Sequence, residues 1–127
     1  MMKQLIYGIL ISLLFASCSK KSTDQPPQSH TIKVTVSGAD AFNVSLSEYK
    51  TTDSSPKIVD AKVVAKGSSY SYTATTLNQN DQVTLVVASD VSNTVTYRIY
   101  DNDKIVVQDT DREVLTHGSV TVTYNIP

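Results

Sequence analysis

The stretch His30-Thr-Ile-Lys-Val-Thr-Val-Ser37 decides the fold class of this chain. Its apolar residues Ile32, Val34 and Val36 alternate with polar ones, so one side of the segment is apolar and the other is polar. This period of two is the pattern of a half-buried β-strand, because successive side chains of a strand point to opposite sides. The segment is also rich in β-branched residues, which favour strands. It therefore predicts the first strand of a β-sheet protein.

The same alternation returns along the rest of the chain. Four further segments show it clearly and three show it weakly: residues 42–47, 83–87, 95–99 and 120–126, and then residues 57–65, 69–75 and 104–108. Turn-forming Gly, Asp, Asn, Ser and Pro residues fall between these segments. The glycines of this region, Gly38, Gly67 and Gly118, stand at such breaks, where a positive φ costs little.

Short strands separated by frequent turns are typical of two antiparallel sheets packed face to face. We therefore expect an all-β fold, a single immunoglobulin-like β-sandwich of seven to eight antiparallel strands over residues 30–127. An up-and-down barrel is the alternative. The chain has one cysteine and no tryptophan, so the disulfide and tryptophan of true immunoglobulin domains are missing. The fold prediction consequently rests on the alternation.

The N-terminal residues have a different composition. Lys3 precedes an apolar run over residues 5–15, and two small residues then lead into Cys18. This order is the layout of a secretory signal peptide. The apolar run of 11 residues is shorter than the roughly 20 that a membrane-spanning helix needs. We expect residues 1–17 to be a signal peptide.

The residues Phe15-Ala-Ser-Cys18 resemble the lipobox of bacterial lipoproteins, with Phe15 in place of the common leucine. The resemblance implies cleavage before Cys18, diacylglycerol on its sulfur, and a further fatty acid such as palmitate on the new amino group. Each buried methylene adds about 0.8 kcal/mol of membrane affinity, so two or three chains hold firmly. The alternative is a secreted protein with a free thiol.

The residues after Cys18 bear on the membrane and on the tether. Ser19 stands where an aspartate would favour retention in the inner membrane, and the start Ser-Cys-Ser-Lys-Lys resembles lipoproteins of Bacteroidota. Both features favour the outer membrane and leave its two faces open. Residues 19–29 (SKKSTDQPPQS) have no aliphatic or aromatic side chain. We therefore expect residues 18–29 to be the lipidated cysteine and a flexible tether, residues 19–29, with a reach of roughly 18 Å.

Several runs of the domain resemble, in their order, the periplasmic β-sandwich of the mycobacterial membrane protein small family. These are Val36-Ser-Gly38, Phe42-Asn-Val44-Ser-Leu46, Val83-Thr-Leu-Val-Val-Ala88, the run from Val95 to Val107, and Val120-Thr-Val-Thr-Tyr124. Where members of that family tend to have Asn-Gly or Asp-Gly, this chain has Asn102-Asp103, and they are anchored by a helix rather than by lipid. The resemblance implies a shared fold. As a function it implies an accessory subunit of an envelope lipid or small-molecule exporter.

Four tyrosines are the candidate binding surface. Tyr70 and Tyr72 share one face of their predicted strand, and Tyr49 and Tyr100 fall on the polar faces of theirs. Tyrosine gives a large contact area at low entropy cost. A sheet surface that exposes these rings would suit a glycan or an envelope protein. The alternative is that the rings pack across strands and stiffen the sheet.

Four aspartates, Asp101, Asp103, Asp109 and Asp111, are weak candidates for metal ligands. Calcium binds six to eight oxygens, but the predicted strand at residues 104–108 would place Asp103 and Asp109 roughly 20 Å apart. We therefore expect no metal there and interpret the aspartates as turn residues that flank a strand. His30 and His117 are the only imidazoles, and we expect both to be exposed and without partners.

The sequence has no signature of catalysis. It lacks a nucleophile elbow, a zinc-binding helix motif and a phosphate-binding glycine loop. After cleavage, removal of Lys3 leaves 10 basic and 12 acidic residues, without the basic patch that nucleic acid requires. We expect no catalytic residues and no cofactor. The predicted function is a non-enzymatic binding or assembly module anchored in the envelope, and a small hydrolase is less favoured. For glycosidase chemistry the chain offers only Glu48 and Glu113 besides the loop aspartates.

Overall fold

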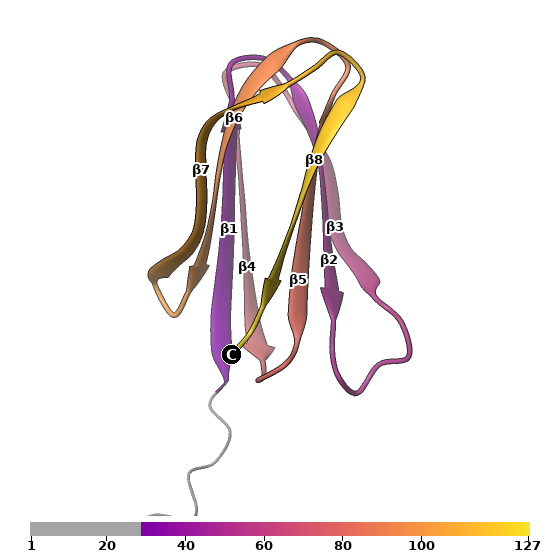
Figure 1. Ribbon diagram of the computed structural model, residues 1–127, viewed down its shortest axis with the longest axis vertical. Helices are drawn as coiled ribbons and strands as arrows, with labels where there is room; N and C mark the ends of the chain where they lie inside the picture. Colours follow the sequence, from indigo (N-terminus) through magenta and orange to yellow (C-terminus); the bar gives the residue numbers. More distant parts are fainter. Residues whose placement is uncertain (1–28) are drawn as a thin grey trace, which may run out of the picture.

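Eight segments with alternating side chains form the strands of the computed structural model, which describes residues 29–127 except for the side chain of Thr75 (Figure 1). The strands are β1 (His30–Gly38), β2 (Phe42–Tyr49), β3 (Lys57–Val64), β4 (Ser69–Leu77), β5 (Gln82–Ser89), β6 (Asn93–Asp101), β7 (Lys104–Val114) and β8 (Gly118–Asn125). Each contains one of the segments predicted from the alternation, or most of it. The predicted signal peptide and Cys18 lie outside the described residues.

The strands pair antiparallel in two four-stranded sheets. Sheet A has the order β4-β1-β6-β7, and sheet B has the order β3-β2-β5-β8. Only β2 with β3, and β6 with β7, are hydrogen-bonded neighbours that also follow one another in the chain. An up-and-down barrel would pair every strand with the next one, so that alternative is wrong. The predicted immunoglobulin-like β-sandwich is confirmed, with eight antiparallel strands.

The core lies between the sheets and comes mainly from alternate residues of the four central strands. Its central residues are Ile32, Val34, Val36, Phe42, Val44, Leu46, Val83, Leu85, Val87, Val95, Tyr97 and Ile99. Burying an aliphatic or aromatic side chain of this size contributes roughly 1.5–3 kcal/mol. Since the chain has a single cysteine, no intramolecular disulfide can add to this, and core packing is the main source of stability.

Three of the four edge strands contain a β-bulge. The register shifts place an extra residue in β3 and in β4, and one at each of two points in β7. Asp111, with a φ of 55°, lies at one of these points, and its backbone N–H donates to Oγ1 of Thr96 at 3.1 Å. The bulges let β7 run on to Val114, so Asp109 and Asp111 are strand residues. Their predicted place in a turn is wrong.

The three glycines serve two different needs. Gly67 has a φ of +84°, which suits glycine. At the other two positions there is no room for a side chain. A Cβ on Gly38 would lie 2.9 Å from Cδ1 of Phe42, and one on Gly118 would lie 2.8 Å from the carbonyl oxygen of Leu115. The expectation that a positive φ explains the glycines is therefore right only for Gly67.

The loops gather at the two ends of the sandwich (Figure 1). We call one end the near pole: it holds the start of β1 at His30, the C terminus, and the loops at residues 50–56, 78–81 and 102–103. The opposite end, the distal pole, holds the loops at residues 39–41, 65–68, 90–92 and 115–117. The two poles carry different kinds of polar and apolar groups.

Candidate functional site

The outer face of sheet B has a shallow hollow toward the distal pole. It has a volume of about 360 Å³ and is lined chiefly by Asn43, Ser45, Ala61, Val63, Val86 and Ala88. The register explains this gathering, because Asn43 pairs with Val63 on one side and with Ala88 on the other. Paired residues point to the same face of a sheet, so Val63 points outward and is 82% exposed.

A second, smaller hollow of about 150 Å³ continues this surface over the distal pole. Asn43 and Val63 line both hollows, and the second one adds the exposed side chain of Val91. We call Ala61, Val63, Val86, Ala88 and Val91 the distal apolar patch. The charged residues around it have both signs, with Lys62 at the first hollow, and Asp40 and Asp90 at the second.

This patch was not predicted from the sequence. Its signal was the neighbouring pair Val63-Val64, because two adjacent residues of one strand cannot both face the core. Val64 is buried and pairs with Phe42, whereas Val63 faces solvent. The pair alone does not tell which valine faces outward, and only the register with β2 decides it.

Asp101, at the end of β6, joins three strands at the near pole. Its Oδ1 lies 2.7 Å from Nδ1 of His30, and its Oδ2 accepts a hydrogen bond of 2.7 Å from the hydroxyl of Tyr124. Asp101 is buried, and the side chain of His30 is only 15% exposed. The prediction that His30 is an exposed bystander is therefore wrong. The sequence could not show this contact, because 71 residues separate the two partners.

The four candidate tyrosines do not form one surface. Tyr70 is buried in the core at 3% exposure, and Tyr72 is half-buried against the same core. Both pair with inward residues of β1, because Val36 lies opposite Tyr70 and Val34 opposite Tyr72. Tyr49 and Tyr100 lie on different sheets, and Tyr100 has Nζ of Lys33 5.6 Å from the centre of its ring. The predicted tyrosine-lined binding surface is wrong, and cross-strand packing accounts for Tyr70 and Tyr72.

Three buried or half-buried tyrosines instead donate hydrogen bonds to aspartates. The pairs are Tyr70 with Asp60 at 2.9 Å, Tyr97 with Asp109 at 3.1 Å, and Tyr124 with Asp101 at 2.7 Å. The first and third link one sheet to the other, since β4 faces β3 and β8 reaches β6. Burial, and then the bond to the carboxylate, raises the pKa of each hydroxyl, to about 12 for Tyr124. These tyrosines are thus neutral donors, and Tyr70 and Tyr124 close the open sides of the sandwich.

The four candidate aspartates are dispersed. Asp101 is buried, Asp103 is exposed in the β6–β7 turn, and Asp109 and Asp111 lie along β7. Asp109 accepts its bond from Tyr97 and lies 3.8 Å from Nη1 of Arg112. Among residues 29–127, no group of three His, Cys, Asp or Glu side chains is arranged to hold a metal ion.

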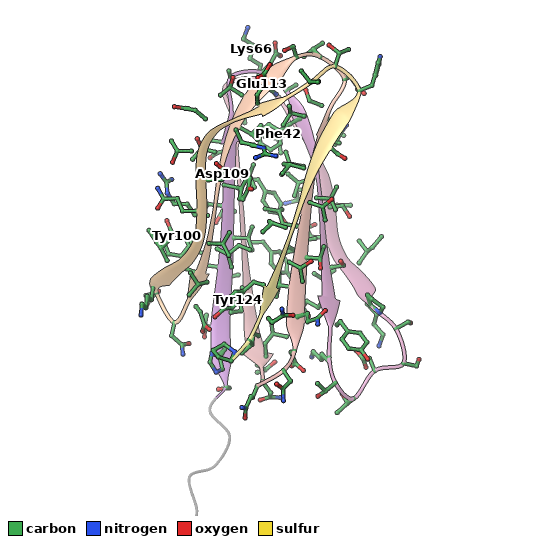
Figure 2. All side chains as sticks on the ribbon, in the orientation of Figure 1. Phe42, Lys66, Tyr100, Asp109, Glu113 and Tyr124 are labelled. Carbon is green, nitrogen blue, oxygen red and sulfur yellow. The ribbon has the colours of Figure 1, made fainter. Side chains whose placement is uncertain are left out.

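Glu48 and Glu113 are far apart along the sandwich. Glu48 pairs with Val83 toward the near pole, whereas Glu113 lies toward the distal pole (Figure 2). Burial raises the pKa of the Glu48 carboxyl, and the charge of Lys50 partly offsets this effect. Because the two carboxyl groups of a glycosidase flank one bond at roughly 5–9.5 Å, this pair cannot serve as an acid and a base on one substrate.

The lipidation prediction concerns Cys18, which lies outside the described residues. Within residues 29–127, the structure contains no helix with the length and apolar character that a membrane crossing requires. Comparison of the chain with protein-family models, with curated proteins and with solved structures gave no match. The resemblance to the mycobacterial membrane protein small family therefore stays a prediction.

Proposed function

We propose that the chain is a lipid-anchored protein of the bacterial cell envelope whose β-sandwich is a non-enzymatic binding or assembly module. Lipid on Cys18 holds it in the outer membrane, and residues 19–29 are the tether. The sandwich binds a protein partner of the envelope through the distal apolar patch. An exporter complex is one candidate for that partner.

The position of the distal apolar patch carries the proposal. β1 begins at His30 on the near pole and ends at Gly38 on the distal pole. Its nine residues extend the domain by roughly 30 Å away from the point where the tether joins. An anchored domain therefore presents its distal pole, with the 82% exposed side chain of Val63, to its surroundings.

The shape and chemistry of the patch favour a protein over a glycan or a small molecule. The hollows are open, whereas pockets for small ligands bury roughly 70–90% of the ligand surface. All five residues of the patch are aliphatic, so no ring in it can stack on a sugar. An apolar centre beside charges of both signs is the usual anatomy of a protein–protein interface.

The anchor is tested by the variant Cys18→Ala in the native host. We expect the wild-type chain in the membrane fraction with the intact mass of a processed, acylated protein, and the variant outside that fraction. The folded domain should be unaffected, because every core residue lies between Ile32 and Ile126. A wild-type protein with an unmodified thiol, or a variant that stays in the membrane, contradicts the anchor.

The partner surface is tested separately, by placing a photo-crosslinking amino acid at Val63 in intact cells. Ile58 is the matched control, since it is exposed on the same strand but toward the near pole. We expect one reproducible cross-linked protein from position 63 and none from position 58. Equal capture at both positions, or none at either, contradicts the proposal.

A further inference from the structure

The outer edge of β8 differs from the other three edges of the sandwich. β8 pairs with β5 in unbroken register from Gly118 to Asn125, with no bulge. It has neither a charged residue nor a proline. Its inward residues Val120, Val122 and Tyr124 remain half-buried, whereas those of the neighbouring β5 are fully buried. A regular, uncharged edge of this kind is a template for pairing with another strand.

The other edges carry features that hinder such pairing. β3 has a bulge, and its inward positions include Lys62, which lies opposite Val44. β7 has two bulges, and Arg112 occupies its inward position opposite Val95. β4 lacks charged residues but has a bulge toward its end. Bulges and inward-pointing charges are the usual protection of edge strands, and β8 has neither.

We propose that β8 pairs antiparallel with β8 of a second copy of this chain, with the two-fold axis at Thr121. This pairing joins the two copies of sheet B into one sheet of eight strands. It is independent of the partner proposed for the distal apolar patch.

The sequence of β8 is complementary to itself in this register. Two-fold pairing at Thr121 places Val120 opposite Val122 and Ser119 opposite Thr123, so inward residues meet inward residues. No like charges meet, which is the usual obstacle when a strand pairs with its own copy. Gly118 faces Tyr124 of the other copy, and an aromatic ring across from a glycine is a known stabilising pair at a sheet edge. These features favour a second copy over an unrelated strand.

Antiparallel pairing also sets the direction of the two anchors, a consequence that rests on the proposed function. It turns the second copy end over end, so the two near poles point in opposite directions. For both anchors to reach one membrane, a tether of eleven residues, about 38 Å when fully extended, would have to run back along a whole domain. The pairing therefore connects copies on two facing membranes more readily than neighbours on one membrane.

A disulfide test uses the chain from Ser19 onward, which keeps every core residue and has no cysteine of its own. In the variant Thr121→Cys the two thiols meet at the axis, where Cα atoms about 4.5–5.5 Å apart suit a disulfide. The control is Thr73→Cys, an exposed threonine on the other uncharged edge, β4. Under mild oxidation we expect a disulfide-linked dimer from position 121 and at least tenfold less from position 73.

A charge test in the same chain complements the disulfide test. Sedimentation equilibrium should show a concentration-dependent dimer for the unsubstituted chain. The variant Thr121→Lys should dissociate about fivefold more readily, because like charges then face each other at the axis. Thr73→Lys should leave the dimer unchanged. A strictly monomeric chain, equal cross-linking at positions 73 and 121, or equal effects of the two lysines would overturn the proposal, whereas the anchor and the distal apolar patch would stand.

Discussion

The two poles of the sandwich bury different polar groups. At the near pole these are two carboxylates, Asp81 at 2% exposure and Asp101 at 8%, whereas at the distal pole they are the neutral side chains of Ser89 at 1% and Asn93 at 4%. All four make hydrogen bonds, and within the described residues no buried side-chain nitrogen or oxygen lacks a partner. The poles therefore differ in charge rather than in how well their polar groups are satisfied.

The difference follows the course of the chain. At the near pole, Asp101 holds His30 at the start of β1 and Tyr124 at the end of β8. Asp81 accepts bonds from the N–H groups of Thr51 and Asn78, and its carbonyl accepts one from Ile126. Charge-assisted bonds are about twice as strong as neutral ones. The stronger bonds thus fasten the start of β1 and the end of β8, whereas the buried side chains that shape the loops beside the distal apolar patch are neutral.

The largest effect on stability is expected from Asp101→Ala. It leaves the hydroxyl of Tyr124 and the ring of His30 without their common partner, and the loss of hydrogen bonds to a buried carboxylate costs about 3 kcal/mol. Urea unfolding at neutral pH measures the loss. Asp90→Ala is the control, because Asp90 is exposed and lies 3.8 Å from an exposed His117. If both variants lose the same free energy of unfolding, the near pole is not held by Asp101.

Asn93→Ala should cost less, about 2 kcal/mol, because it removes neutral bonds. Nδ2 of Asn93 donates to the carbonyls of Asp40 and Ala41, both at 3.1 Å, and its Oδ1 accepts from the N–H of Asp40 at 2.9 Å. Besides the loss in urea unfolding, the amide of Asp40 should exchange its hydrogen faster. The exposed Asn125→Ala is the control. A loss for Asn93→Ala above that for Asp101→Ala would reverse the ranking of the poles.

Tyr124→Phe should lower the free energy of unfolding by about 1 kcal/mol at neutral pH, the net value of one hydrogen bond. The pKa of Tyr124 is raised to about 12, from an ordinary value of 10.0, by burial and by the bond to Asp101. The stabilisation from a neutral group with a raised pKa is complete below the unfolded pKa and is lost as the pH rises through the folded pKa.

The difference in stability between the wild type and Tyr124→Phe should therefore shrink from about pH 10 to about pH 12. Urea unfolding at several alkaline pH values tests this. A constant difference across that range would mean that the hydroxyl of Tyr124 is not held neutral by the fold.

The sequence predicted the strands well because alternation is a local property. Contacts that depend on the register between strands could not be predicted from the sequence. A spacing of two residues predicts that Tyr70 and Tyr72 share a face of their strand. Only the pairing of Val36 with Tyr70 shows that this face lies in the core. In the same way the bulge at Asp111 and the contact of His30 with Asp101 arise from pairing between distant strands. The candidate site was missed for this reason, since the outward direction of Val63 is set by β2.

The smallest effect on stability is expected at the distal apolar patch itself. Val63→Glu should change the free energy of unfolding by no more than about 0.5 kcal/mol, because the side chain of Val63 is 82% exposed and has little packing to lose. Ile58→Glu, at 72% exposure on the same strand, should be equally mild. The two variants should differ only in partner binding. Val63→Glu should abolish recovery of the partner cross-linked at position 63, and Ile58→Glu should leave it intact.

A loss of recovery in both variants would mean that added negative charge anywhere on β3 repels the partner. A loss in neither would place the partner elsewhere. The pair is informative because both variants keep the fold, so a difference between them reports on the partner surface alone. If a charge at Val63 leaves the free energy of unfolding nearly unchanged but abolishes partner binding, the exposed valine contributes to binding rather than to stability.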